Sequence, residues 1–191
     1  MKRRHLWPIA LLLLPLCACG GGGGDGDSGP VNDTLPSTTL SAAFVSDAES
    51  VEAGTVWLSE GNSSGSLVTV RVNVTDLEQI YAAGFDFEFD SSRVEFVNWS
   101  PGSLLESGNQ TPIYQVQAQQ GKLVVGVSRT GDVEGVDASG TQTLILLTFR
   151  ARQAGTSAAV LDNATLLRPG SGTGPVPILD TIWTGGQFNA N

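Results

Sequence analysis

The sequence predicts an all-β fold, a single antiparallel β-sandwich of about nine strands over residues 41–191. The first observation is alternation: in "GFDFEFD" (84–90) three phenylalanines alternate with three carboxylates, as in a strand with one buried and one exposed side. The second is that short turn signals rich in Gly, Ser and Pro separate the apolar runs. The third is that no long segment carries the apolar period of a helix.

Each expected strand is an apolar or alternating run that ends at a turn signal. After a less regular first strand near residue 41, "VTVRVNV" (68–74) places four valines on one side and polar residues on the other. "DSS" ends the phenylalanine strand, and we expect Asp90 to stabilise that turn with Ser91 and Ser92. The remaining expected strands are 93–99, 112–118, 122–128, 143–151, 157–167 and 177–183.

The N-terminal segment predicts export. A charged start precedes the apolar run 6–16, which is too short to remain in a bilayer and is typical of a signal peptide, here residues 1–18. The run "LCAC" (16–19) resembles the lipobox of bacterial lipoproteins, which implies lipidation of Cys19; an ordinary secretory signal is the alternative. Residues 19–40, rich in Gly, Ser and Pro, predict a flexible tether. We therefore expect a lipid anchor in the bacterial cell envelope, with the domain facing outward.

The charge balance excludes several classes of function. The chain has 19 acidic and 10 basic residues, and three of the basic residues lie in the signal peptide, so the mature net charge is 7 − 19 = −12. Such a chain does not neutralise a phosphate backbone, so nucleic acid is not an expected partner. The single histidine, His5, also lies in the signal peptide, so sites that depend on a histidine base or a histidine zinc ligand are not expected.

Two longer runs resemble the cohesin family. "AAGFDFEFDSSRVEFVNWSPGSLL" (82–105) has alternating aromatic residues, an aspartate at the turn, and a strand that ends before a glycine and two leucines. "GTQTLILLTFRARQAGTSAAVL" (140–161) resembles the later family strand that ends in phenylalanine, whereas 56–65 resembles an insertion. The resemblance covers about residues 42–185 and implies a jelly-roll sandwich without catalytic activity. Such modules dock dockerins, which carry paired calcium loops and belong to polysaccharide-degrading enzymes; this chain would be the receptor.

The resemblance also implies where a partner docks. Its register turns alternate residues of 143–151 and of 122–128 outward and places both strands beside 84–90 in one sheet. An apolar centre next to charged groups is typical of protein interfaces. A covering loop, or a slip of one residue that buries the aliphatic side chains, is the alternative. The expected docking face comprises Asp86, Glu88, Val124, Gly126, Leu144 and Leu146.

Catalysis and metal binding are weaker interpretations of the acidic residues. Asp86 and Glu88 are expected on an open, solvated strand face, which does not produce the proton-holding acid that a glycosidase needs. Asp132, Glu134 and Asp137 supply oxygen atoms suited to calcium, but their segment also has the composition of an ordinary polar loop. We expect no enzyme activity, no cofactor and no metal site on this chain; calcium is expected on the partner.

The tryptophans leave a second function open. Trp99 and Trp183 can stack on a sugar, or they can cap the ends of the sandwich, where a large amphipathic ring is commonly buried. A polysaccharide-binding module is therefore the first alternative to docking. A structural envelope lipoprotein without a specific ligand is the second.

Overall fold

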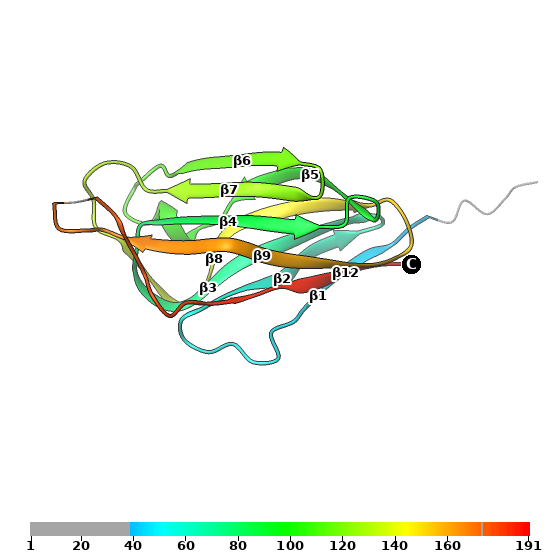
Figure 1. The fold of residues 1–191 in the computed structure, drawn as a ribbon, viewed down its shortest axis with the longest axis horizontal. Coiled ribbons are helices and arrows are strands. Elements are labelled where there is room, and N and C mark those ends of the chain that lie inside the picture. The colour runs from blue at the N-terminus through cyan, green and yellow to red at the C-terminus, as the bar shows by residue number, and fades with distance from the viewer. Residues whose placement is uncertain (1–38, 173) are drawn as a thin grey trace, which may run out of the picture. The chain divides into compact units, whose positions relative to one another are not determined.

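The computed structural model describes residues 39–172 and 174–191, which form a β-sandwich of twelve strands and one turn of 3-10 helix (Figure 1). The predicted signal peptide 1–18, the predicted lipidation site Cys19 and nearly all of the predicted tether 19–40 lie outside the described residues. Within the described ranges, no helix has the length and hydropathy needed to cross a membrane. The all-β prediction is confirmed.

Two sheets form the sandwich, and Figure 1 shows them as two layers. The seven-stranded sheet has the order β1 (Ala42–Ser46), β12 (Gly186–Ala190), β9 (Gly155–Arg168), β4 (Ala82–Phe89), β7 (Lys122–Ser128) and β6 (Ile113–Gln119), with β10 (Val176–Pro177) paired to β9. The five-stranded sheet has the order β11 (Ile182–Thr184), β2 (Thr55–Ser64), β3 (Leu67–Ile80), β8 (Val136–Ala151) and β5 (Val94–Pro101). The 3-10 turn η1 (Leu104–Glu106) follows β5. This is the jelly-roll sandwich that the sequence predicts.

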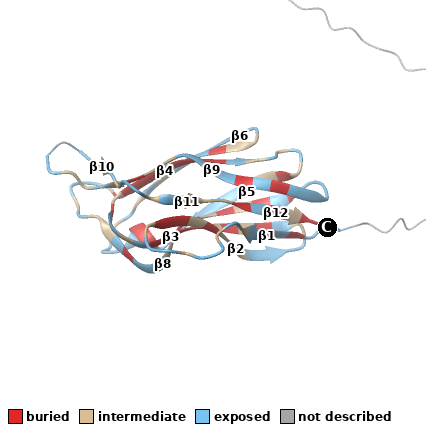
Figure 2. Cartoon of the chain, turned by 60° about the horizontal axis from the view of Figure 1, so that its bottom comes forward, coloured by how far each residue is buried: buried red, intermediate tan, exposed pale blue. Residues whose placement is uncertain are grey.

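Buried and exposed residues alternate along the strands, as the colours of Figure 2 show. The buried apolar side chains fill the space between the sheets. Phe85 and Phe87 are 3% and 0% exposed, and the four predicted valines of β3 are at most 1% exposed. Phe87 stacks on Phe149 of the opposite sheet, with ring centroids 5.2 Å apart, and Phe149 contacts Phe188 of β12 at 4.8 Å. Burial of each such side chain stabilises the fold by about 1.5–3 kcal/mol. The predicted core role of these phenylalanines and valines is confirmed.

Three elements differ from the prediction. Residues 56–65, which resemble an insertion, belong to β2, a strand that lies between β11 and β3. The expected strand 177–183 is divided between the sheets: β10 joins one and β11 the other, and Leu179 between them is 77% exposed. β12 was not expected; it joins β1 to β9 and adds Phe188 to the core. β11 runs parallel to β2, whereas every other strand pair in the described residues is antiparallel.

Candidate functional site

The predicted docking face is divided between the two outer surfaces of the sandwich. Asp86 and Glu88 lie on β4, and Val124 and Gly126 lie on β7, its neighbour in the seven-stranded sheet. The two predicted leucines lie on β8, which belongs to the five-stranded sheet. The prediction that β8 flanks β4 is therefore wrong. An alternating strand pattern shows which side chains turn inward, but not which strand is the neighbour.

Leu144 is a core residue, with 0% of its surface exposed. In the pairing of β3 with β8, Val72 lies opposite Ile145 and Asn73 opposite Thr143. Leu144 is therefore an extra residue in β8, a β-bulge, and the alternation of the strand is interrupted there. Because of this bulge, Leu144 and Ile145 are both fully buried. The prediction that Leu144 belongs to a docking face is wrong.

Leu146 does turn away from the core, but on the five-stranded sheet. Its cross-strand neighbours are Arg71 of β3 and Ser100 of β5, and its side chain is half-buried. Leu146 therefore lies on the surface opposite to Asp86. A change at this position does not disturb a surface formed by β4 and β7.

The outward side of β6, β7, β4 and β9 is a continuous surface, termed here the open face. Across it Val124 lies opposite Asp86, and Gly126 lies opposite Gly84. Val124 is 36% exposed, whereas the residues before and after it in β7 are buried, so the predicted alternation of β7 is confirmed. Further members of the open face are Ile113, Gln115, Gln117, Lys122, Glu88, Val160, Asp162 and Asn163.

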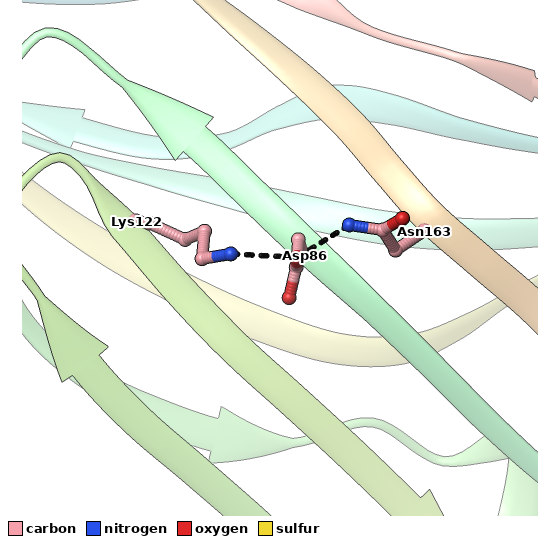
Figure 3. A network of polar contacts seen from close by, with 3 residues as sticks. All are labelled: Asp86, Lys122 and Asn163. Atoms are coloured by element: carbon pink, nitrogen blue, oxygen red, sulfur yellow. Dashed lines mark hydrogen bonds and ion pairs between the residues drawn. The ribbon is translucent and has the colours of Figure 1, made fainter.

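Asp86 lies at the centre of a polar network on the open face (Figure 3). Lys122 Nζ and Asn163 Nδ2 each donate a hydrogen bond of 2.8 Å to Asp86 Oδ2. The hydrogen bond from Lys122, followed by that from Asn163, holds the pKa of Asp86 below its ordinary value. Asp86 is only 8% exposed, so the prediction that it is a solvated carboxylate is wrong, whereas Glu88 is exposed as predicted.

Asn163 reaches Asp86 because β9 contains a bulge. The register between β4 and β9 shifts between the pairs Gly84–Thr165 and Asp86–Asp162, which leaves Asn163 outside the regular ladder. The backbone of Asn163 has a φ of +46°, a left-handed conformation that Asn tolerates better than most residues. The bulge therefore directs an amide at a buried carboxylate, and no periodicity in "SAAVLDNATLL" indicates it.

The chemistry of the network suits binding rather than catalysis. Three carboxylates, those of Asp86, Glu88 and Asp162, surround the single ammonium of Lys122, and its pKa is raised chiefly by the hydrogen bond to Asp86. The open face is therefore acidic around Lys122. A glycosidase acid needs a raised pKa, whereas Asp86 has a lowered one and remains ionised at neutral pH.

Two glycines in the middle of the open face are not required by the fold. A Cβ at Gly126 would have no heavy atom within 4 Å, and one at Gly84 would approach nothing closer than 3.9 Å, the carbonyl oxygen of Val125. Neither glycine has a positive φ. Glycine in a strand costs about 0.5–1 kcal/mol relative to alanine. The paired glycines form a flat floor between exposed Val124 and Ile113, where another molecule's backbone can approach closely.

The two tryptophans do not form one platform. Trp99 lies on β5 and Trp183 on β11, the two opposite edges of the five-stranded sheet. Trp183 is partly buried and packs against Phe85 of the core, with ring centroids 6.0 Å apart, which is the packing that the capping alternative expects. Trp99 is 36% exposed and stacks on Tyr114.

Asp90 stabilises the turn after β4, as predicted. The hydroxyl of Ser92 donates to Asp90 Oδ1 at 2.6 Å, and the backbone N–H of Ser92 donates to the same oxygen at 2.8 Å. These two bonds, the hydroxyl's first, hold the pKa of Asp90 below its ordinary value. The third carboxylate of "GFDFEFD" therefore has a structural role.

The acidic segment after β7 is not gathered into a metal site. Asp137 Oδ1 accepts a hydrogen bond of 2.9 Å from the backbone N–H of Gln79, whereas Asp132 and Glu134 are exposed. Among residues 39–172 and 174–191, no three His, Cys, Asp or Glu side chains are placed to hold a metal ion. The calcium ligands suggested by this segment are therefore not brought together.

The family model described as cohesin domain matches residues 53–177, more than half of the chain. The chain belongs to the cohesin family. Cohesin domains are non-catalytic binding modules, which confirms the expectation of a protein without enzyme activity. Both runs that carry the resemblance, 82–105 and 140–161, lie inside the matched region of this cohesin.

The chain is also similar to solved structures. The second type II cohesin module of the ScaA scaffoldin of Acetivibrio cellulolyticus is 16% identical with a TM-score of 0.53, over 78% of this chain and 88% of that chain. The third ScaC cohesin of the same organism, crystallised in complex with the ScaB dockerin, is 17% identical with a TM-score of 0.51, over 65% and 88%. A non-cellulosomal cohesin from Archaeoglobus fulgidus is 15% identical with a TM-score of 0.48, over 76% and 88%. A search of curated proteins gave no match.

Proposed function

We propose that this cohesin docks dockerin-bearing, polysaccharide-degrading enzymes through the open face. The observation that carries the proposal is the pair Gly84 and Gly126, which the fold does not require, next to the exposed side chain of Val124. Exposed apolar side chains beside charged groups are typical of a binding surface. A cohesin relative that has been crystallised with a dockerin supports the choice of partner.

The open face defines the chemistry of the partner. The flat glycine floor accepts a closely packed helix or loop, and Ile113 and Val124 on either side accept apolar side chains. Glu88 and Asp162, with Asp86, favour a partner that carries Lys or Arg at the matching position. Asp86 is 8% exposed and is held by Lys122 and Asn163, so the carboxylates that a partner meets are the exposed ones of Glu88 and Asp162.

The test is capture by the immobilised full chain from the secreted proteins of its own organism, with and without a calcium chelator. We expect dockerin-bearing enzymes to be captured. The chelator releases them because it removes the calcium that the dockerin loops hold. Val124→Arg abolishes capture, whereas Leu146→Glu on the other sheet retains it. The two variants are matched, because each new charge lies opposite a balancing residue, Asp86 or Arg71 respectively.

Two outcomes contradict the proposal. If Leu146→Glu loses capture and Val124→Arg keeps it, the interface lies on the five-stranded sheet. If the folded chain captures no dockerin-bearing protein, the polysaccharide-binding module becomes the better interpretation.

We also propose the cellular setting that the sequence predicts: Cys19 carries lipid and holds the domain on the outer side of the cell envelope. Docked enzymes would then stay close to the cell, next to the sugars that they release. Metabolic labelling with a radioactive fatty acid tests this setting. Label in the full chain and no label in Cys19→Ser is the expected result, and equal labelling of both contradicts it.

A further inference from the structure

A hollow lies along the outer strand β6, at the edge of the sandwich where the two sheets end. Its volume is about 540 Å³. It reaches from Val124 and Gly126 on the open face to Trp99 of β5 in the other sheet. Glutamines of β6 line its length. The hollow therefore joins part of the open face to an aromatic residue that the docking proposal does not use.

The aromatic wall of the hollow is a fixed pair. The rings of Trp99 and Tyr114 lie 5.3 Å apart between centroids and 28° apart in plane. The hydroxyl of Tyr114 donates to the carbonyl of Gly102 at 3.2 Å, which holds the ring in place. Tyr114 is half-buried, whereas 36% of Trp99 is exposed.

The polar groups of the hollow are neutral amides. Gln115 and Gln117 are exposed, and because they alternate with Tyr114 along the strand they turn to the open-face side of β6, whereas Tyr114 and Trp99 lie on its other side. Each amide supplies two donors and one acceptor oxygen, which suits a ligand with neighbouring hydroxyl groups. The residues that line the hollow include no charged side chain, although the chain has 19 acidic and 10 basic residues.

From this juxtaposition we propose that the hollow binds a neutral polysaccharide chain that crosses the edge strand β6, with Trp99 as the stacking surface on one side and the amides of Gln115 and Gln117 as hydroxyl-binding groups on the other. The residues that line the hollow supply no positive charge, and an anionic polysaccharide would meet the exposed carboxylates of Glu88 and Asp162 on the open face and a chain of formal charge −9. The aromatic wall of the hollow, Trp99 and Tyr114, takes no part in the proposed dockerin docking. It shares Val124 and Gly126 with the open face, so a bound polysaccharide and a docked protein compete there.

The test is affinity electrophoresis of the full chain in native gels that contain hydroxyethyl cellulose, xyloglucan or polygalacturonate. One or both neutral polymers retard the chain, and anionic polygalacturonate does not. Trp99→Ala raises the dissociation constant at least about fivefold, because stacking of one aromatic ring is worth on the order of 1 kcal/mol or more. Gln117→Ala raises it about threefold, through the loss of one amide.

The controls separate this site from adhesion and from docking. Leu179→Ala removes the most exposed large apolar side chain among the described residues and leaves retardation unchanged. Reduced retardation of this variant would show that the gel reports non-specific adhesion. Gln117→Ala alters an exposed side chain, so it tests the hollow even if Trp99→Ala loosens the edge of the sandwich. Trp99→Ala still captures dockerin-bearing proteins. Unchanged retardation in both hollow variants, or equal retardation by polygalacturonate, overturns the proposal without affecting docking.

Discussion

The outer surfaces of the two sheets differ in where their polar groups find partners. On the five-stranded sheet, hydroxyl and amide side chains bond to one another across strands: Thr69 with Thr148 at 3.1 Å, and Thr75 with Thr141 at 2.9 Å. Asn73 continues this polar ladder by donating to the hydroxyl of Ser59 at 2.8 Å. These side chains form hydrogen bonds with one another and need no ligand. The outer side of the five-stranded sheet that carries them is termed here the ladder surface.

The open face has a different composition. Its middle consists of glycine and valine, and its main polar contacts converge on Asp86, from Lys122 and Asn163. A partner that covers exposed apolar side chains such as Val124 and Val160 stabilises the complex by burying them. Covering a ladder of hydroxyls that already bond to one another stabilises a complex little. The comparison shows why the open face, rather than the ladder surface, is the candidate for docking.

The largest expected effect separates two leucines of one strand. Leu144→Glu places a carboxylate in the core, where Leu144 has no exposed surface, and lowers the free energy of unfolding by at least about 3–5 kcal/mol. Leu146→Glu, on the ladder surface opposite Arg71, changes it by no more than about 1 kcal/mol. Urea unfolding of both variants measures the difference. Equal, small effects would mean that Leu144 is exposed, as the sequence alone predicts.

The second prediction sharpens the distinction between fold and binding on the open face. Gly126→Val leaves the free energy of unfolding unchanged or raises it slightly, because a Cβ there meets no atom within 4 Å. The same variant weakens dockerin binding at least about thirtyfold, an effect of about 2 kcal/mol, because the flat floor is blocked. Calorimetric titration with a captured dockerin module measures this loss.

Gly102→Ala is the control for the glycine variant. A Cβ at Gly102 would collide with the backbone carbonyl of Thr143, so this variant destabilises the fold. If Gly126→Val also destabilises the fold, then Gly126 has a structural role and is no sign of a binding floor.

The third prediction concerns the ladder surface. Asn73→Ala removes the amide that donates to Ser59 and accepts from Thr143, and Asn73 is only 3% exposed. The loss leaves two hydroxyls without these partners and costs about 1–3 kcal/mol of unfolding free energy, with dockerin binding unchanged. Thermal unfolding compares it with Asn98→Ala, an exposed change on the same sheet that is expected to have almost no effect. A loss of binding in Asn73→Ala would contradict the assignment of docking to the open face.

The smallest expected effect is a pH dependence of stability. The pKa of Asp86 is lower in the folded chain than in the unfolded chain, so its contribution to stability is present above the unfolded pKa and is lost as pH falls through the folded pKa. Asp86→Asn removes this contribution, so its free energy of unfolding decreases less steeply as the pH is lowered below about 4. Urea unfolding at a series of pH values measures the slope, and Asp90→Asn is the matched variant because its pKa is also lowered. Identical slopes in Asp86→Asn and in the unmodified chain would mean that the network is not formed in solution.

Part of the candidate site follows from alternation alone. Val124 and Gly126 are outward in β7 because their neighbours are apolar and buried, a pattern that is readable in "KLVVGVS". Gly84, the first residue of "GFDFEFD", lies directly opposite Gly126, a pairing that neither strand's own sequence indicates. No sequence pattern predicts the stacking of Trp99 on Tyr114, because 14 residues lie between them in the chain and their strands belong to different sheets.

The sequence by itself determined the fold class, the inward side of most strands and the turn at Asp90, because alternation and turn chemistry are local properties. Only the tertiary structure decided which strands are neighbours, and so removed β8 from the open face. It also decided the two bulges that bury Leu144 and direct Asn163 at Asp86. A bulge is one extra residue whose position depends on the partner strand, and strand order depends on contacts between distant residues; neither is a periodic feature of a single strand.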